Sequence, residues 1–183
     1  MVLGLFLITP SQADDIRDFQ IEGISIGDSL LDYFSEEEIK KNLVDQNYKD
    51  NKFSIFEYKG LNSYETYENL QIGFKTKDKK YRIYYVDGVI LLDDFKECYK
   101  KKDKIVNEIS TLFENETKDD QGIRTHPQDP SGKSKISVVY FDLDSGNFID
   151  VACYDWSEEI GFLDHLRVGL ATKEWNDWVN KQY

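Results

Sequence analysis

The spacing of apolar residues changes twice along the chain, and this change constrains the fold more than any other feature. Three runs rich in aromatic and β-branched residues, "FSIFEY" (53–58), "NLQIGFKT" (69–76) and "YRIYYVDGVILL" (81–92), are separated by polar turn residues and predict three strands. From residue 93 to 114 the apolar residues recur at helical spacing, which predicts one long amphipathic helix. Strands resume in "KISVVYFDLD" and "NFIDVACYDW". Strands that follow one another without a helix between them pair antiparallel, so the pattern predicts β-meanders.

Polar capping residues predict where the shorter helices begin. Asp28 or Ser29 follows a glycine and is placed to cap a short helix. The stretch "SEEE" that starts at Ser35 is a capping box and predicts a second helix. Near the end of the chain, a strand at 166–171 is followed by Thr172, which is placed to cap a final helix.

These elements define an α+β fold class. We expect antiparallel β-meanders of about six strands with helices packed on one face. Residues 14–183 are expected to form a single domain, with two helix-plus-three-strand units at 14–92 and 93–183 as candidate subunits. The segment after the long helix, "NETKDDQGIRTHPQDPSGKSK", holds two of the chain's three prolines and is predicted to be a long exposed loop.

The chain contains two cysteines, and the predicted elements orient both of them toward one interface. Helical spacing places Cys98 on the apolar face of the long helix, and strand alternation places Cys153 on the same face as Ile149 and Val151. A disulfide between Cys98 and Cys153 is therefore a candidate. Two free buried thiols are the alternative, because pairing requires Cα atoms within about 7 Å and spacing in the sequence leaves that open.

The N-terminal stretch "MVLGLFLITPSQADD" is typical of the end of a secretory signal. An apolar run at 2–8 is followed by Pro10 and by Ser11 and Ala13 at the small-residue positions of a cleavage site. We interpret residues 1–13 as a signal-peptide remnant and expect a periplasmic or secreted protein. The alternative is an N-terminal core strand, because no Lys or Arg precedes the apolar run. No apolar run approaches the roughly 20 residues that cross a bilayer, so the chain is not expected to span a membrane.

Much of the chain resembles a group of exported proteins of marine bacteria to which no function is assigned. The resemblance runs from "ADDIRDFQIEGISIGDSLLDYFSEEEI" through "YDWSEE" to "LRVGLATKEWNDWV". It implies an exported location and carries no implication about activity.

The charge of the chain restricts its partners. A formal net charge of -12 disfavours nucleic acid and anionic membrane surfaces, because binding to phosphates draws on Lys and Arg. We therefore expect no nucleic-acid partner.

The tetrapeptide "GDSL", with its serine at Ser29, resembles the nucleophile block of the GDSL esterases and lipases. That family also needs a Gly-x-Asn-Asp block and an Asp-x-x-His that supplies the base. Ile123 stands three residues before His126 and Phe162 three before His165, so neither histidine matches. A serine without an oriented base is a poor nucleophile, and a helix cap is the favoured interpretation of Ser29. A serine esterase using Ser29 remains the alternative function.

Two further stretches only partly match ligand-binding motifs. In "PQDPSGKS", Pro127 stands where a phosphate-binding P-loop needs its first glycine. In "DLDSGNFID", Gly146 occupies the fifth position, where a calcium loop needs an oxygen ligand. The two histidines also lack the ligand spacing of a transition-metal site. We therefore expect no metal and no cofactor.

Aromatic residues on the predicted strands are the remaining candidates for function. Tyr84, Tyr154 and Trp156 lie on strands whose alternation exposes some side chains on a face without helices. Half-buried strand residues are the simpler interpretation, since strands favour aromatics. Aromatic side chains also supply much of the energy of binding surfaces. We predict a non-catalytic, exported binding or interaction protein whose partner is an envelope protein, a peptide or a glycan.

Overall fold

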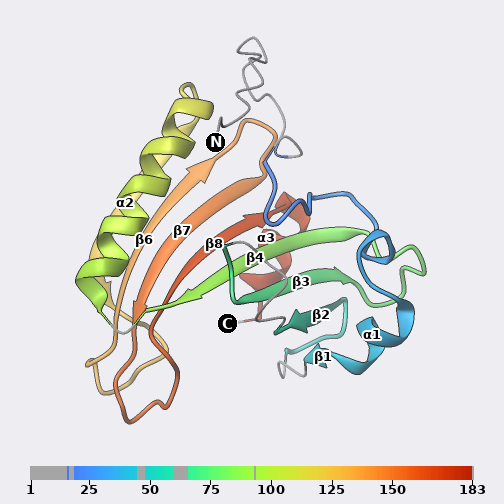
Figure 1. Cartoon of the computed structure of the whole chain (residues 1–183), viewed down its shortest axis with the longest axis horizontal. Helices are drawn as coiled ribbons and strands as arrows, with labels where there is room; N and C mark the ends of the chain where they lie inside the picture. Colours follow the sequence, from blue (N-terminus) through green and yellow to red (C-terminus); the bar gives the residue numbers. More distant parts are fainter. Residues whose placement is uncertain (1–15, 17–18, 45–47, 60–65, 93, 183) are drawn as a thin grey trace, which may run out of the picture.

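An antiparallel sheet of eight strands forms the centre of the molecule (Figure 1). The computed structural model describes residues 16, 19–44, 48–59, 66–92 and 94–182. The expected signal remnant at 1–13 lies outside the described residues. The strands and helices are β1 (Leu43–Val44), β2 (Phe53–Tyr58), β3 (Asn69–Lys75), β4 (Ile83–Leu91), β5 (Thr117–Thr125), β6 (Lys135–Asp142), β7 (Phe148–Asp155), β8 (His165–Ala171), α1 (Glu36–Lys41), α2 (Phe95–Leu112) and α3 (Lys173–Val179), with a 3-10 helix at Leu30–Asp32.

Two four-stranded meanders share this sheet. The strand order is β1-β2-β3-β4-β8-β7-β6-β5, so the first meander joins the second through antiparallel pairing of β4 with β8. Helix α2 carries the chain from the central strand β4 to the far edge at β5. The α+β class and the antiparallel meanders are confirmed, but the expected number of about six strands is wrong. The short strand β1 and the whole of β5 were missed.

Strand β5 occupies part of the segment that was expected to be a long loop. All nine of its residues are exposed, and it is held by backbone pairing with β6 at the sheet edge. A bulge between Asp120 and Ile123, with Gly122 at a φ of +58°, interrupts the pairing. The prediction was wrong because a strand with both faces exposed carries no alternation of apolar and polar side chains.

The helices cover both faces of the sheet, which corrects the expectation that they pack on one face. The back face, defined here by Cys153, is covered by α2 and by an N-terminal segment that includes Leu30 and Ile39. The front face carries α3, whose Trp175 lies directly on Gly73 of β3. A Cβ atom at Gly73 would lie 2.3 Å from the Trp175 ring, so the missing side chain makes room for α3. The helical spacing of Trp175 and Trp178 predicts helix α3, but it does not predict which face of the sheet this helix covers.

The cysteine pair is bonded and joins α2 to β7. Cys98 and Cys153 have Cα atoms 6.0 Å apart and form a disulfide, so the paired alternative is confirmed. With 55 residues between its ends, this bridge stabilises the fold by about 4 kcal/mol in the chain-entropy model.

The predicted helix starts are confirmed at the level of single hydrogen bonds. Ser29 caps the 3-10 helix, Ser35 and Glu38 form a reciprocal capping box, and Thr172 accepts from the amide of Trp175. Glycine 146 closes the hairpin between β6 and β7 at a φ of +79°. Within the described part of the chain, no helix is both long and apolar enough to cross a membrane.

Candidate functional site

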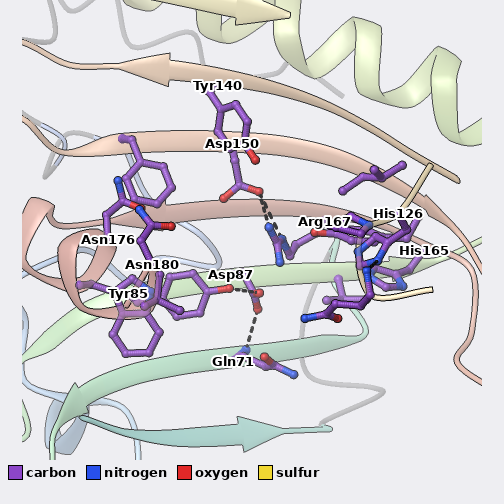
Figure 2. A pocket seen from close by; sticks show the side chains of 18 of the residues that line it. Gln71, Tyr85, Asp87, His126, Tyr140, Asp150, His165, Arg167, Asn176 and Asn180 are labelled. Carbon is purple, nitrogen blue, oxygen red and sulfur yellow. Dashed lines mark hydrogen bonds and ion pairs between the residues drawn. The ribbon is translucent and has the colours of Figure 1, made fainter. Parts of the chain in front are cut away.

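A pocket of about 680 Å³ opens on the front face of the sheet beside α3 (Figure 2). Strands β3, β4, β8, β7 and β6 form its floor, while α3 and the segment after β5 form its walls. The residues that line its polar part are Gln71, Tyr85, Asp87, Arg124, His126, Tyr140, Asp150, Tyr154, Trp156, His165, Arg167, Asn176 and Asn180.

Strand register places a row of polar residues across the floor of this pocket. Gln71 pairs with Asp87, Asp87 with Gly169, Gly169 with Asp150, and Asp150 with Tyr140. Residues paired in register share one face of a sheet, so all four side chains point to the front. Two strand spacings separate the Cα atoms of Asp87 and Asp150, roughly 10 Å. We call these five residues the polar row.

Asp150 of the polar row forms an ion pair with Arg167, and the acidic side of this pair is almost completely shielded from solvent. Arg167 donates from Nε and Nη2 to Oδ2 of Asp150, at 3.2 and 2.8 Å. The side chain of Asp150 is 3% exposed and that of Arg167 is 28% exposed. The carboxylate is therefore a fixed part of the floor, whereas the guanidinium still faces the cavity.

A second carboxylate, Asp87, is held by uncharged donors. The Tyr85 hydroxyl donates to Oδ2 of Asp87, and the backbone N–H of Gln71 donates to Oδ1 at 3.1 Å. Burial raises the pKa of Asp87 to about 6, although Arg167 and the Tyr85 hydrogen bond favour the charged form. The two acids of the row therefore differ, since Asp150 forms an ion pair and Asp87 lies near its midpoint of protonation at mildly acidic pH.

Aromatic rings form one wall of the pocket around Tyr154. The Tyr154 ring stacks with Trp156 at 5.8 Å between centroids and with His165 at 4.5 Å. The ring of His126 lies 4.2 Å from that of Trp156, and the guanidinium of Arg167 lies 5.2 Å from the Tyr154 centroid. Burial raises the pKa of Tyr154, so its hydroxyl stays protonated at neutral pH.

Both histidines of this wall favour the neutral form. Burial lowers the pKa of His126, and the charges of Arg124 and Arg167 lower it further. Burial also lowers the pKa of His165, with smaller contributions from Arg167 and His126 that outweigh Asp164. The hydrogen bond of His165 Nδ1 with the carbonyl of Leu163, at 2.8 Å, opposes this shift.

A hydrogen-bonded loop holds the aromatic wall in place. Asp129 accepts from the backbone N–H groups of Ser131 and Ser134 at 2.8 Å, and from the hydroxyls of Ser134 and Ser157. These bonds, led by the Ser134 hydroxyl, lower the pKa of Asp129. They tie the loop that carries His126 to the segment just after Trp156. The sequence predicted only that the segment after the long helix is exposed, whereas hydrogen bonds between Asp129 and serine residues give its second half a defined structure.

The structure brings together two of the three aromatic residues singled out in the sequence. Tyr154 and Trp156 stand side by side in the pocket wall. Tyr84 instead packs against Phe53, at 5.3 Å between centroids, with the ammonium of Lys75 lying 4.6 Å from its ring. It belongs to the apolar cluster beneath α3 and does not line the pocket.

Ser29 lies in the N-terminal cap of the 3-10 helix. Its hydroxyl donates to the carbonyl of Lys80 at 2.7 Å and accepts from the backbone N–H of Leu31 at 3.2 Å. Both histidines line the front-face pocket, and neither hydrogen bond of Ser29 involves a histidine or a carboxylate. The local structure agrees with the capping interpretation.

Sequence reasoning missed the charged floor of the pocket. Asp87, Asp150 and Arg167 lie in the predicted strands "YVDGV", "FIDVA" and "LRVG", where each charge is flanked by apolar residues. A charged residue inside an otherwise apolar strand is a signal for a buried polar network. From the sequence, His126 and His165 were weighed as the base of a serine esterase and as metal ligands, but not as parts of a pocket wall. Among the residues that the structure describes, no cluster of three or more metal-binding side chains occurs.

Comparison of the chain with protein-family models, with curated proteins and with solved structures finds no match.

Proposed function

We propose that this chain is an exported, non-catalytic binding protein that holds a small polar ligand with a flat apolar face, such as a sugar unit of a glycan. The observation that carries the proposal is the position of the Tyr154 and Trp156 rings beside the polar row in one pocket. Binding sites of this kind combine aromatic walls with a few fixed polar groups that orient the ligand.

The aromatic wall supports this choice because its rings are fixed before any ligand arrives. Tyr154 is 7% exposed and is stacked between neighbours. Rigid rings lose little conformational entropy on binding, so their contact area contributes to affinity at low cost. The apolar C–H face of a sugar ring would match such a surface.

The floor supports the polar part of the proposal. Arginine has five N–H donors, and the hydrogen bonds to Asp150 use two of those of Arg167. Asn176 of α3 and Asn180, the residue that caps the end of α3, add amide groups on the opposite wall (Figure 2). Hydroxyl groups of a ligand both donate and accept, and they fit a floor that presents both kinds of partner.

The exported location is supported by two features together. The Cys98–Cys153 disulfide is stable in an oxidising compartment, and the N-terminal sequence is typical of a secretory signal. An esterase that uses Ser29 is not favoured, because its hydroxyl is engaged in a helix cap. Labelling of wild type but not of Ser29→Ala by a fluorophosphonate probe would revive that alternative.

The test is saturation-transfer NMR with a panel of glucose, galactose, N-acetylglucosamine and glucuronate. At least one sugar should receive saturation from the wild type, and Trp156→Ala should weaken its binding by about tenfold, the equivalent of roughly 1.4 kcal/mol. Tyr33→Ala is the matched control, because Tyr33 is a partly exposed aromatic residue that does not line the pocket. Absence of binding by every sugar, or equal loss in both variants, would overturn the proposal.

A further inference from the structure

Basic side chains collect at one end of the pocket in an otherwise acidic protein. The chain has a net charge of -12 and contains two histidines and four arginines. Both histidines and two of the arginines line this one pocket: Arg124, His126, His165 and Arg167. We call these four residues the basic corner.

The geometry of the basic corner is centred on the Tyr154 ring. His165 stacks on this ring at 4.5 Å, the Arg167 guanidinium lies 5.2 Å from its centroid, and His126 lies 5.7 Å away. Arg124 stands at the end of β5, opposite Ile136 of β6, in the same cross-strand register as Tyr154. The four side chains therefore meet from β5, from the loop after it and from β8.

The carboxylates around the basic corner are already hydrogen-bonded, and one of them, Asp150, pairs with Arg167 of the corner itself. Asp150 accepts two hydrogen bonds from Arg167, and Asp129 accepts from serine hydroxyls and amides. Asp164 accepts from the backbone N–H of Trp156 at 2.7 Å. Asp87 belongs to the polar row. Within the described ranges Arg124 forms no ion pair with a carboxylate.

The basic corner and the polar row meet at the ion pair of Arg167 with Asp150, and the histidines lie farther from the acids along the pocket floor. His165 and Gly169 are four residues apart on β8, which corresponds to roughly 13 Å along a strand. Positive charge is thus concentrated near the loops, while the two acids lie toward α3. A ligand that spans the floor meets cations at one end and hydroxyl-binding groups at the other.

We infer that the basic corner binds the carboxylate of an acidic sugar, a hexuronic acid unit, whose ring lies against Trp156 in the aromatic wall. This inference rests on the proposed function and specifies its ligand class. Arginine guanidinium groups bind carboxylates in a planar, two-pronged geometry, and protonated histidines add further donors. The carboxylate would face Arg124 and the N–H donors of Arg167 that Asp150 does not use.

Proton uptake is a direct consequence of this arrangement. The pKa of each histidine is lowered first by burial and then by neighbouring cations, including Arg167 in both cases. A bound carboxylate favours the protonated imidazoles, so it raises both pKa values and binds more tightly as the pH falls. Arg124, Arg167, Asp129 and Asp164 are the charged side chains that act on the pKa values of the two histidines.

Titration calorimetry with D-glucuronate and D-glucose provides the test. We expect glucuronate to bind wild type about tenfold more tightly than glucose at pH 6, with the advantage shrinking several-fold at pH 8 as the histidines lose their protons. Repeating the titration in buffers of different ionisation enthalpy should show net proton uptake with glucuronate only.

Variants separate this inference from the proposed function. Arg124→Gln changes an exposed edge-strand residue and should remove most of the preference for glucuronate. Arg82→Gln is the control, because Arg82 is ion-paired with Asp78 and does not line the pocket. Equal affinity for glucose and glucuronate, or binding of neutral sugars alone, overturns the inference and leaves the proposed function intact. If no sugar binds, both are wrong.

Discussion

Gly169 and Asp150 are cross-strand partners, and the carboxylate of Asp150 occupies the space that a side chain at position 169 would fill. A Cβ atom at Gly169 would lie 2.5 Å from Oδ1 of Asp150. The carboxylate therefore lies over the neighbouring strand, where Arg167 reaches it with two donors. One glycine thus determines how the charge pair sits on the pocket floor.

Replacing this glycine should destabilise the protein. In Gly169→Ala the new methyl group would push the Asp150 carboxylate away from Arg167, and overpacking of this kind costs about 1–3 kcal/mol. Urea denaturation of the variant and the wild type measures the loss. An unchanged urea midpoint would contradict this prediction, because it would show that the Asp150 side chain adopts another position without loss of stability.

Removing the arginine should have a larger effect than overpacking. Arg167→Met leaves the buried Asp150 carboxylate without its partner, which costs about 3–5 kcal/mol. The double variant Arg167→Met/Asp150→Asn should recover most of this loss, because no buried charge remains. Chemical denaturation of both variants gives the comparison.

A surface ion pair provides the matched control for that experiment. Arg82 pairs with Asp78, but its side chain is 55% exposed, so Arg82→Met should leave the unfolding free energy unchanged within error. If this variant lost as much stability as Arg167→Met, burial would not be the cause.

The raised pKa of Asp87 predicts a dependence of stability on pH. The folded protein holds a proton on Asp87 up to a pKa of about 6, whereas the unfolded chain releases it near 3.9. The unfolded state binds fewer protons between these values, so this group lowers the stability as the pH rises through that window. Two pKa units correspond to about 3 kcal/mol at neutral pH.

The variant Asp87→Asn isolates this contribution. Asparagine can accept from the Gln71 N–H and donate to the Tyr85 oxygen, so it keeps the local hydrogen bonds without the charge. We expect the variant to gain up to about 3 kcal/mol over wild type at pH 7 and little or nothing at pH 4. Urea denaturation at both values tests the sign. A constant difference across this range would contradict the shift.

The disulfide should contribute to the stability of the sheet as a whole. Replacing Cys98 and Cys153 together by alanine should lower the unfolding free energy by about 4 kcal/mol, since the closed loop spans 55 residues. Thermal denaturation of wild type with and without a thiol reductant provides an independent measurement. Reduction should shift the wild-type midpoint and leave the double variant unaffected.

Much of the fold could be predicted because most elements carry a side-chain pattern. Strands β2, β3, β4, β6, β7 and β8 have apolar runs, and caps such as Ser35 and Thr172 mark helix starts. Strand β5 has no such pattern, because all nine of its residues are exposed and its position depends mainly on backbone pairing with β6. The side of the sheet taken by α3 depends on the contact of Trp175 with Gly73, which joins two distant parts of the chain.

The pocket could be predicted only in part for a similar reason. Strand alternation and aromatic character indicated Tyr154 and Trp156. The polar row depends on β4 lying beside β8, and local sequence does not specify which strands of two meanders become neighbours. The sequence alone therefore gave no sign that Asp87 and Asp150 lie near each other. Their proximity follows from the strand register, in which Gly169 pairs with both residues.

The pairing of β4 with β8 makes the pocket a joint product of both halves of the chain. Gln71 and Asp87 come from the first meander, and Asp150 and Tyr140 come from the second. A ligand bound across the β4–β8 pairing would contact both halves of the chain, and it would dissociate if the two halves separated. Such a ligand would therefore stabilise the pairing of the two halves. At a concentration one hundred times its Kd, this ligand would add about 2.7 kcal/mol to the stability of the folded protein.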